Sequence, residues 1–236
     1  VLDKTLIGII TQNANENGYY EQATKIINMT KALTFTSLNT VLGARISYLF
    51  SEKKYNEIQE RINLSINYIF FIGFGIMFGL LAVSDKFVPL FFGTGYEKVI
   101  YIIKILSPLI IIIGISNCLG SQYYNPAGLR AKSAKFIIIG SVVNLVLNLI
   151  LIPSLWSYGA SIATIIAELT ITLLYIKFCD NYLNIKTLIK VSKNKIIAGF
   201  IMFIAIYWFN YLTIANFYIV ALQVIAGISI YTMMLF

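Results

Sequence analysis

The stretch "IIIGSVVNLVLNLILIP", residues 137–153, contains no charged side chain and ends at a proline. A helix needs about 20 mostly apolar residues to cross the hydrocarbon core of a bilayer. Extended back to residue 134, the stretch supplies them, so we expect a membrane-spanning helix over 134–153. Further spans are predicted over residues 20–50, 64–84, 99–120, 159–178, 195–211 and 216–236.

Composition agrees with a membrane protein. Hydrophobic residues make up 58% of the chain and charged residues 12%, and the mean hydropathy is +0.80. These values predict an all-α, polytopic transmembrane helix bundle. The chain has no His, and Cys118 and Cys179 lack metal-ligand or disulfide spacing, so we expect buried free thiols, no metal, no cofactor, no catalytic residues and no enzymatic activity.

Lys and Arg gather in alternate loops, which indicates the cytoplasmic side. These loops hold Lys53, Lys54, Arg61, Arg130, Lys132, Lys135, Lys177, Lys186, Lys190, Lys193 and Lys195. The intervening loops, "SDKFVPLFFGTGYEK" among them, hold Lys86 and Lys98 and are expected outside. The net charge of +8 is therefore explained by topology, and nucleic acid is not an expected partner.

Polar side chains converge on one face of the predicted helix 20–50. On a wheel of about 100° per residue they share about 140° of arc: Glu21, Thr24, Lys25, Asn28, Lys31, Thr36 and Asn39. Ionisable groups within a span normally face a bundle interior or a water-filled cavity, so Lys25, Asn28 and Lys31 favour a lumen. The alternative is a Glu21–Lys25 pair at the interface with Lys31 snorkelling. Arg45 falls off this face.

Two other helices carry weaker polar faces. Gly140, Asn144 and Asn148 are spaced by four, which fits either a lumen or interhelical hydrogen bonding. Glu168 is an acid deep in a span, and it is expected to be protonated, as in a proton relay, or paired with Lys104 or Lys31. Pro108 predicts a kink within residues 99–120.

Several short motifs occur in an order that resembles a known family. They are "LDKTLIG" (2–8), "GYYEQATKI" (18–26), "LGARIS" (42–47), "FFGTGYE" (91–97), Gln122 with Pro126, "NLVLNLILIP" (144–153) and "GASIATIIAE" (159–168). Together they resemble the C-terminal half of the Wzx-type polysaccharide or O-antigen flippases of the multidrug, oligosaccharidyl-lipid and polysaccharide exporter superfamily. Ala44 departs from the proline that such proteins often have before the Arg.

The resemblance implies a two-lobe exporter. Residues 1–180 would be the C-terminal lobe, with a truncated helix 7 and helices 8 to 12, and residues 181–236 two additional helices, 13 and 14. The N-terminal lobe would be absent, and the opening run "VLDKTLIGII", too short to span, would be the end of a longer helix.

The resemblance also implies a function: flipping of undecaprenyl-pyrophosphate-linked oligosaccharide across the bacterial inner membrane. Partners would be this lipid-linked substrate, membrane lipids, the missing lobe and polysaccharide polymerase machinery. Candidate lumen residues are Lys25, Lys31, Arg45, Asn28, Asn39, Asn144 and Asn148, and candidate ion-coupling residues are Asp3, Glu168 and Lys104. A drug or cation exporter, a membrane-embedded polysaccharide-synthesis enzyme and an inactive fragment are the alternatives.

Overall fold

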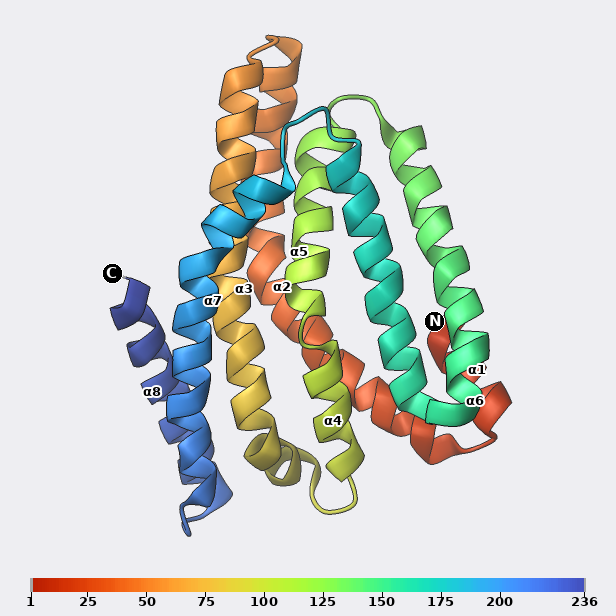
Figure 1. Ribbon diagram of the computed structural model, residues 1–236, viewed down its shortest axis with the longest axis vertical. Coiled ribbons are helices and arrows are strands. Elements are labelled where there is room, and N and C mark those ends of the chain that lie inside the picture. Colours follow the sequence, from red (N-terminus) through yellow and green to blue (C-terminus); the bar gives the residue numbers. More distant parts are fainter. Residues whose placement is uncertain (1, 236) are drawn as a thin grey trace.

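The computed structural model describes the backbone of residues 2–235 and their side chains, except those of residue 33 and residues 36–44. Every regular element in this part of the chain is a helix, which confirms the all-α prediction (Figure 1). The elements are α1 (Leu2–Thr11), α2 (Ala14–Ser51), α3 (Tyr55–Phe92), α4 (Glu97–Leu106), α5 (Leu109–Leu119), η1 (Gly120–Tyr124), α6 (Arg130–Lys177), α7 (Ile185–Tyr207), η2 (Trp208–Tyr211) and α8 (Asn216–Leu235).

The helices differ in whether they are long and apolar enough to cross a membrane. Among the described residues α3, α6 and α8 are long and apolar enough to cross a membrane, and the bent pair α4–α5 adds a fourth candidate. Helices α2 and α7, predicted as spans, do not meet this test. Lysines crowd the first half of α7, and polar residues recur along the whole length of α2, so neither helix contains a sufficiently long apolar run.

Helix α6 consists of two halves that run antiparallel, side by side, on either side of a break (Figure 1). At the break Trp156 adopts φ 57° and ψ −131°, a conformation that costs free energy for a side chain larger than glycine. Gly159 follows, and a Cβ there would lie 2.4 Å from the carbonyl oxygen of Leu151. The predicted spans 134–153 and 159–178 are these two halves, joined by a sharp turn that is tighter than the loop we expected.

Pro108 and Pro89 lie in segments for which the sequence predicted a kink and a loop, respectively. Helices α4 and α5 bend by 40° at Ser107 and Pro108, so the predicted kink is confirmed. The predicted outer loop 84–98 is wrong in extent, because α3 continues through Pro89 to Phe92. The amide of Gly93 closes this last turn by donating to the carbonyl of Pro89, which leaves residues 93–96 as the loop.

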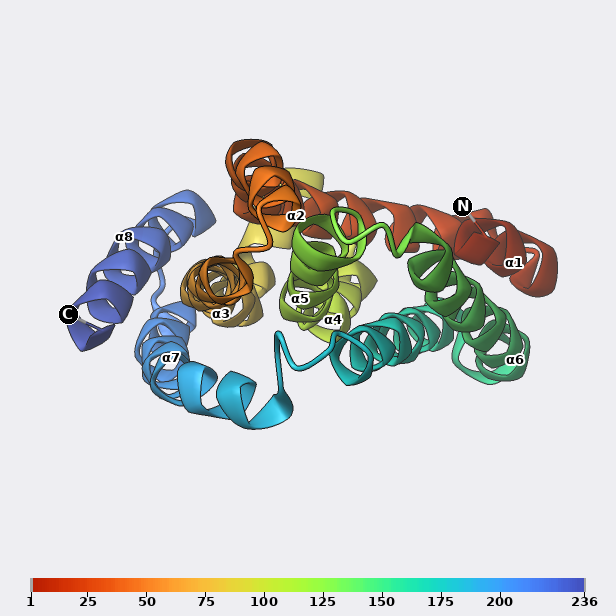
Figure 2. The same ribbon diagram turned by 90° about the horizontal axis from the view of Figure 1, so that it is seen from above.

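Helices α7 and α8 pack against α3, at the opposite end of the bundle from α1 and α6 (Figure 2). A Cβ on Gly199 would lie 2.3 Å from Cδ2 of Phe78, so glycine permits the close approach of α7 to α3. The hydroxyl of Tyr231 in α8 donates to the carbonyl of Phe71 at 2.8 Å. Residues 181–236 are thus attached to the rest of the bundle mainly through α3, and the ring of Tyr182 also packs against Phe50 of α2 and Tyr123 of η1.

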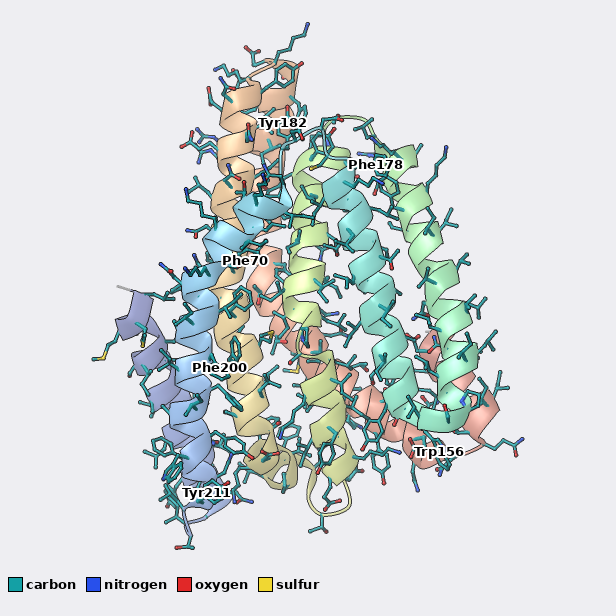
Figure 3. All side chains as sticks on the ribbon, viewed as in Figure 1. Phe70, Trp156, Phe178, Tyr182, Phe200 and Tyr211 are labelled. Carbon is teal, nitrogen blue, oxygen red and sulfur yellow. The ribbon has the colours of Figure 1, made fainter. Side chains whose placement is uncertain are left out.

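Aromatic side chains mark both ends of the bundle. Figure 3 places Phe178 and Tyr182 near one end and Trp156 and Tyr211 at the other. Trp and Tyr are enriched at the two interfaces of a membrane, where a ring can meet both lipid and water. The predicted cytoplasmic loops share the end of Phe178. Both cysteines are buried and free, as expected.

Candidate functional site

A cavity of about 430 Å³ opens among α1, α2, the α4–α5 bend and the second half of α6. The side chains of Leu106, Leu109 and Ile113 form its apolar wall. Five of the residues proposed from the sequence line it: Asp3, Lys25, Asn28, Lys31 and Glu168. The polar face of α2 therefore borders a cavity, as the lumen interpretation requires for Asn28 and Lys31.

Lys25 has a bonded counter-charge, which it shares with Lys4. Its ammonium lies 3.2 Å from the carboxylate of Glu21 one turn earlier, so the alternative i, i+4 pair is also present. Lys4 of α1 reaches the same Glu21 oxygen at 3.4 Å. All three side chains are roughly two-fifths exposed or more, and exposed pairs of this kind contribute little to stability.

Lys31 and Glu168 also line the cavity, but neither has a bonded ion-pair partner among the described residues. Among the described residues neither side chain makes an ion pair within 4 Å or a hydrogen bond, although the two charges interact across the space. Both are partly buried. An ammonium held in a membrane-embedded lobe without a bonded counter-charge is costly, so Lys31 is the group best placed to receive an anion.

Lys104 does not belong to this cavity. The expected pairing of Glu168 with Lys104 is wrong, because Lys104 bonds Asp85 of α3 at 2.6 Å. Asp85 was assigned to an outer loop, and the extra helical turns of α3 bring it beside α4. Among the described residues no group of three or more His, Cys, Asp or Glu side chains could hold a metal ion.

The amides of α6 connect helices. Asn148, fully buried, donates to Asp3 at 2.7 Å and to Asn144 at 3.0 Å. A Cβ on Gly140 would lie 2.3 Å from Ile171, so glycine lets the two halves of α6 approach. These contacts support interhelical hydrogen bonding for Asn148, whereas Asn144 bonds Asn148 within the same half of α6. The oxygen Oδ1 of Asn148 has no hydrogen-bond donor, which leaves one buried acceptor beside the carboxylate of Asp3.

Two candidates remain, Arg45 and Asn39. Arg45 is exposed and does not line it, and the side chain of Asn39 lies outside the described residues. Lys4, Tyr20 and Thr164 also line the cavity and were not among the candidate site residues from the sequence. The hydroxyls of Tyr20 and Thr164 share a hydrogen bond of 3.1 Å.

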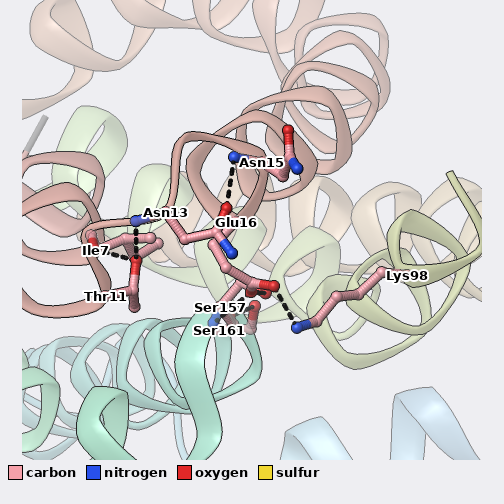
Figure 4. Close-up of polar contacts among 8 residues, drawn as sticks. All are labelled: Ile7, Thr11, Asn13, Asn15, Glu16, Lys98, Ser157 and Ser161. Atoms are coloured by element: carbon pink, nitrogen blue, oxygen red, sulfur yellow. Dashed lines mark hydrogen bonds and ion pairs between the residues drawn. The ribbon is translucent and has the colours of Figure 1, made fainter. Parts of the chain in front are cut away.

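A second charged cluster ties three segments together at the end of the bundle that contains Trp156 (Figure 4). Glu16, at the start of α2, is 4% exposed. One of its carboxylate oxygens lies 2.6 Å from Lys98, and the other accepts from the hydroxyl of Ser157 at 2.7 Å and from its backbone N–H at 3.3 Å. Lys98 also lies over the rings of Trp156 and Tyr158. This cluster fixes the break in α6 against α2 and α4.

Comparison with known proteins agrees with this architecture. A family model described as lipid II flippase MurJ matches residues 9–227. The probable low-salt glycan biosynthesis flippase Agl15 of Haloferax volcanii is 28% identical over 191 residues, which are 78% of this chain and 39% of that protein. The putative O-antigen transporter of Escherichia coli K12 is 25% identical over 166 residues, 70% of this chain and 39% of that protein.

A solved structure has the same fold. The lipid II flippase MurJ in an inward closed conformation superposes with a TM-score of 0.81 at 20% identity, over 99% of this chain and 49% of that chain. The chain thus spans less than half the length of these proteins. The resemblance to lipid-linked flippases is confirmed, and the chain belongs to the MurJ family of lipid flippases.

Proposed function

We propose that this chain forms one lobe of a flippase that moves undecaprenyl-pyrophosphate-linked oligosaccharides across the bacterial cytoplasmic membrane, for the synthesis of O-antigen, capsule or exopolysaccharide. The proposal rests mainly on Lys31, which lines the cavity of a largely apolar helix bundle and whose ammonium has no bonded counter-charge among the residues that the structure describes. The names of the two curated relatives, a glycan biosynthesis flippase and an O-antigen transporter, support this class of substrate.

The cavity suits the polar head of such a lipid. A pyrophosphate loses strong hydration when it enters a low-dielectric region, so it needs charged or hydrogen-bonding groups there. Lys31 supplies a positive charge and Asn28 an amide, while Lys25 contributes less because Glu21 compensates it. Pockets for small molecules typically measure about 300–1,000 Å³, so a volume of about 430 Å³ fits a pyrophosphate with the adjoining sugar. The polyprenyl tail would remain in lipid.

A complete transport path needs a second wall. We propose that another lobe faces α1 and α2, and that rocking of the two lobes exposes the cavity to each side in turn. Membrane lipids surround the assembly, and a polysaccharide polymerase would receive the flipped substrate. The function requires no enzymatic step in this chain.

Ion coupling is assigned to Asp3 and Glu168. Asp3 lines the cavity with its carboxylate and accepts a hydrogen bond from the amide of Asn148, so this carboxylate is the group that would receive a proton or a cation. Glu168 faces Lys31 across the cavity and can exchange a proton or respond to the bound anion. Lys104, held by Asp85 away from the cavity wall, is left out of this proposal.

Reconstitution tests the function directly. The protein expressed from its own gene would be placed in liposomes with a fluorescent undecaprenyl-pyrophosphate oligosaccharide, and outer-leaflet label would be destroyed chemically to measure flipping. We expect the pyrophosphate-linked lipid to flip and a lipophilic cationic drug not to be transported. Transport of the drug with no flipping of the lipid would favour the drug-exporter alternative and refute the proposal.

A further inference from the structure

The first turns of α7 present a stripe of lysines to the outside of the bundle. Lys186, Lys190 and Lys193 are all exposed, and at about 100° per residue they fall within about 60° of arc. Lys195 does not belong to this stripe, because it turns inward and its ammonium donates to the carbonyl of Val191 at 3.0 Å. We call Lys186, Lys190 and Lys193 the α7 basic stripe.

No acidic side chain compensates the α7 basic stripe. Helix α7 contains no Asp or Glu, and within the described residues none of the three lysines forms an ion pair. The nearby acid Asp180 accepts a short hydrogen bond from the hydroxyl of Tyr123. Like charges three and four residues apart on a helix repel one another, so the stripe is stabilised when an anion binds it.

Exposed apolar side chains lie beside the stripe. Ile185 is 54% exposed and Ile189 is 62% exposed, and both sit on the arc adjacent to the lysines. Lysine stems extend along apolar surface while their ammonium groups stay in water. A helix segment in the headgroup region of a membrane typically has apolar side chains, which contact acyl chains, beside lysines, which contact phosphates.

The stripe lies away from the cavity. Figure 2 shows α7 on the opposite side of the bundle from α1, one of the helices that line the cavity. Two further lysines lie at the same end of the molecule, since Lys132 and Lys177 are both positioned over the ring of Phe178, at 5.3 and 5.5 Å from its centroid. The α7 basic stripe is therefore separate from the site proposed for the substrate, and the end of the molecule where it lies carries further lysines.

We propose that the α7 basic stripe is a binding site for the headgroups of acidic phospholipids in the surrounding membrane. The lysines bind the headgroup phosphate, and Ile185 and Ile189 contact the acyl chains of the same lipid. The site does not depend on the flippase proposal, because a membrane protein of any function that carried this surface would bind acidic lipid.

Native mass spectrometry of the delipidated protein in detergent tests the site. Phosphatidylglycerol and phosphatidylcholine with the same acyl chains would be titrated separately, and the ratio of their dissociation constants gives the preference for acidic lipid. The test variant is Lys186→Gln/Lys190→Gln. The control is Lys53→Gln/Lys54→Gln, which removes the same charge from the exposed α2–α3 turn.

Each lysine near an anionic lipid surface contributes about fivefold to binding at low salt. We expect the test variant to lose roughly tenfold or more of the preference for phosphatidylglycerol, and the control to keep it. An unchanged preference in the test variant would overturn the proposal, as would an equal loss in both variants. Displacement of phosphatidylglycerol from the unmodified protein by inorganic pyrophosphate at constant ionic strength would assign the stripe to soluble anions and overturn it as well.

Discussion

Replacing Lys98 by alanine tests whether the charged cluster of Figure 4 holds the break of α6 in place. The side chain of Glu16 is 5% exposed and that of Lys98 is 25% exposed, so the substitution leaves a buried carboxylate without its counter-charge. Removing one partner of a buried pair costs about 3–5 kcal/mol. Ser157 still donates to the carboxylate, which places the expected loss at the lower end, about 3 kcal/mol.

A double-mutant cycle isolates the interaction. Glu16→Ala, Lys98→Ala and the double variant would be unfolded reversibly with SDS in mixed micelles and followed by circular dichroism. Residues in direct contact show coupling energies of about 0.5–3 kcal/mol, and we expect about 2 kcal/mol here. The exposed pair Lys54–Glu57, 3.8 Å apart, is the control and should give less than about 1 kcal/mol. If the losses in unfolding free energy of Glu16→Ala and Lys98→Ala add to within about 0.5 kcal/mol in the double variant, the cluster does not hold the break of α6 in place.

Two further predictions concern topology and the turn within α6. Cysteines introduced at the exposed residues Ser154 and Thr213 should react in intact cells with an impermeant thiol reagent, whereas one at Lys53 should react only after permeabilisation, because loop charge assigns these sites to opposite sides; the reverse pattern would invert the topology. Gly159→Ala should lower the free energy of unfolding by about 1–3 kcal/mol, because the added methyl would lie 2.4 Å from the carbonyl oxygen of Leu151. An unfolding midpoint equal to that of the unmodified protein would show that the turn relaxes freely.

The helices were predictable because the apolar runs and prolines that determine them are visible in short stretches of sequence. Apolar runs of the length of a bilayer lie within α3, α6 and α8, and Pro108 indicated the bend between α4 and α5. The end of α3 was predicted wrongly, because α3 continues past the charged residues Asp85 and Lys86 and through Pro89 to Phe92, although proline lacks the N–H that a helical hydrogen bond needs. The polar face of α2 also followed from periodicity alone.

The partners of charged residues were not predictable, because they come from distant parts of the chain. Asp3 and Asn148 are 145 positions apart, and Glu16 and Lys98 are 82 apart. A helix wheel shows that Lys25 and Lys31 share a face, but only the packing of α1 against α2 shows that Lys4 joins Lys25 on Glu21. The partner of Lys25 lies in its own helix and was therefore foreseeable, whereas the tertiary structure was needed to show that Lys31 has no bonded partner among the described residues.

Export measured for variants of Lys31 tests the proposed cavity most directly. Flipping of the pyrophosphate-linked lipid would be measured per unit of membrane-inserted protein for Lys31→Gln, Lys31→Arg, Lys25→Gln and the exposed control Lys53→Gln. A hydrogen bond to a charged group contributes about 1.5–3 kcal/mol, so Lys31→Gln should weaken apparent affinity roughly tenfold or more, Lys31→Arg should retain most of it, and Lys25→Gln should have a smaller effect than Lys31→Gln. Flipping by Lys31→Gln equal to that of the unmodified protein would contradict the assignment of this cavity to the anionic head of the substrate.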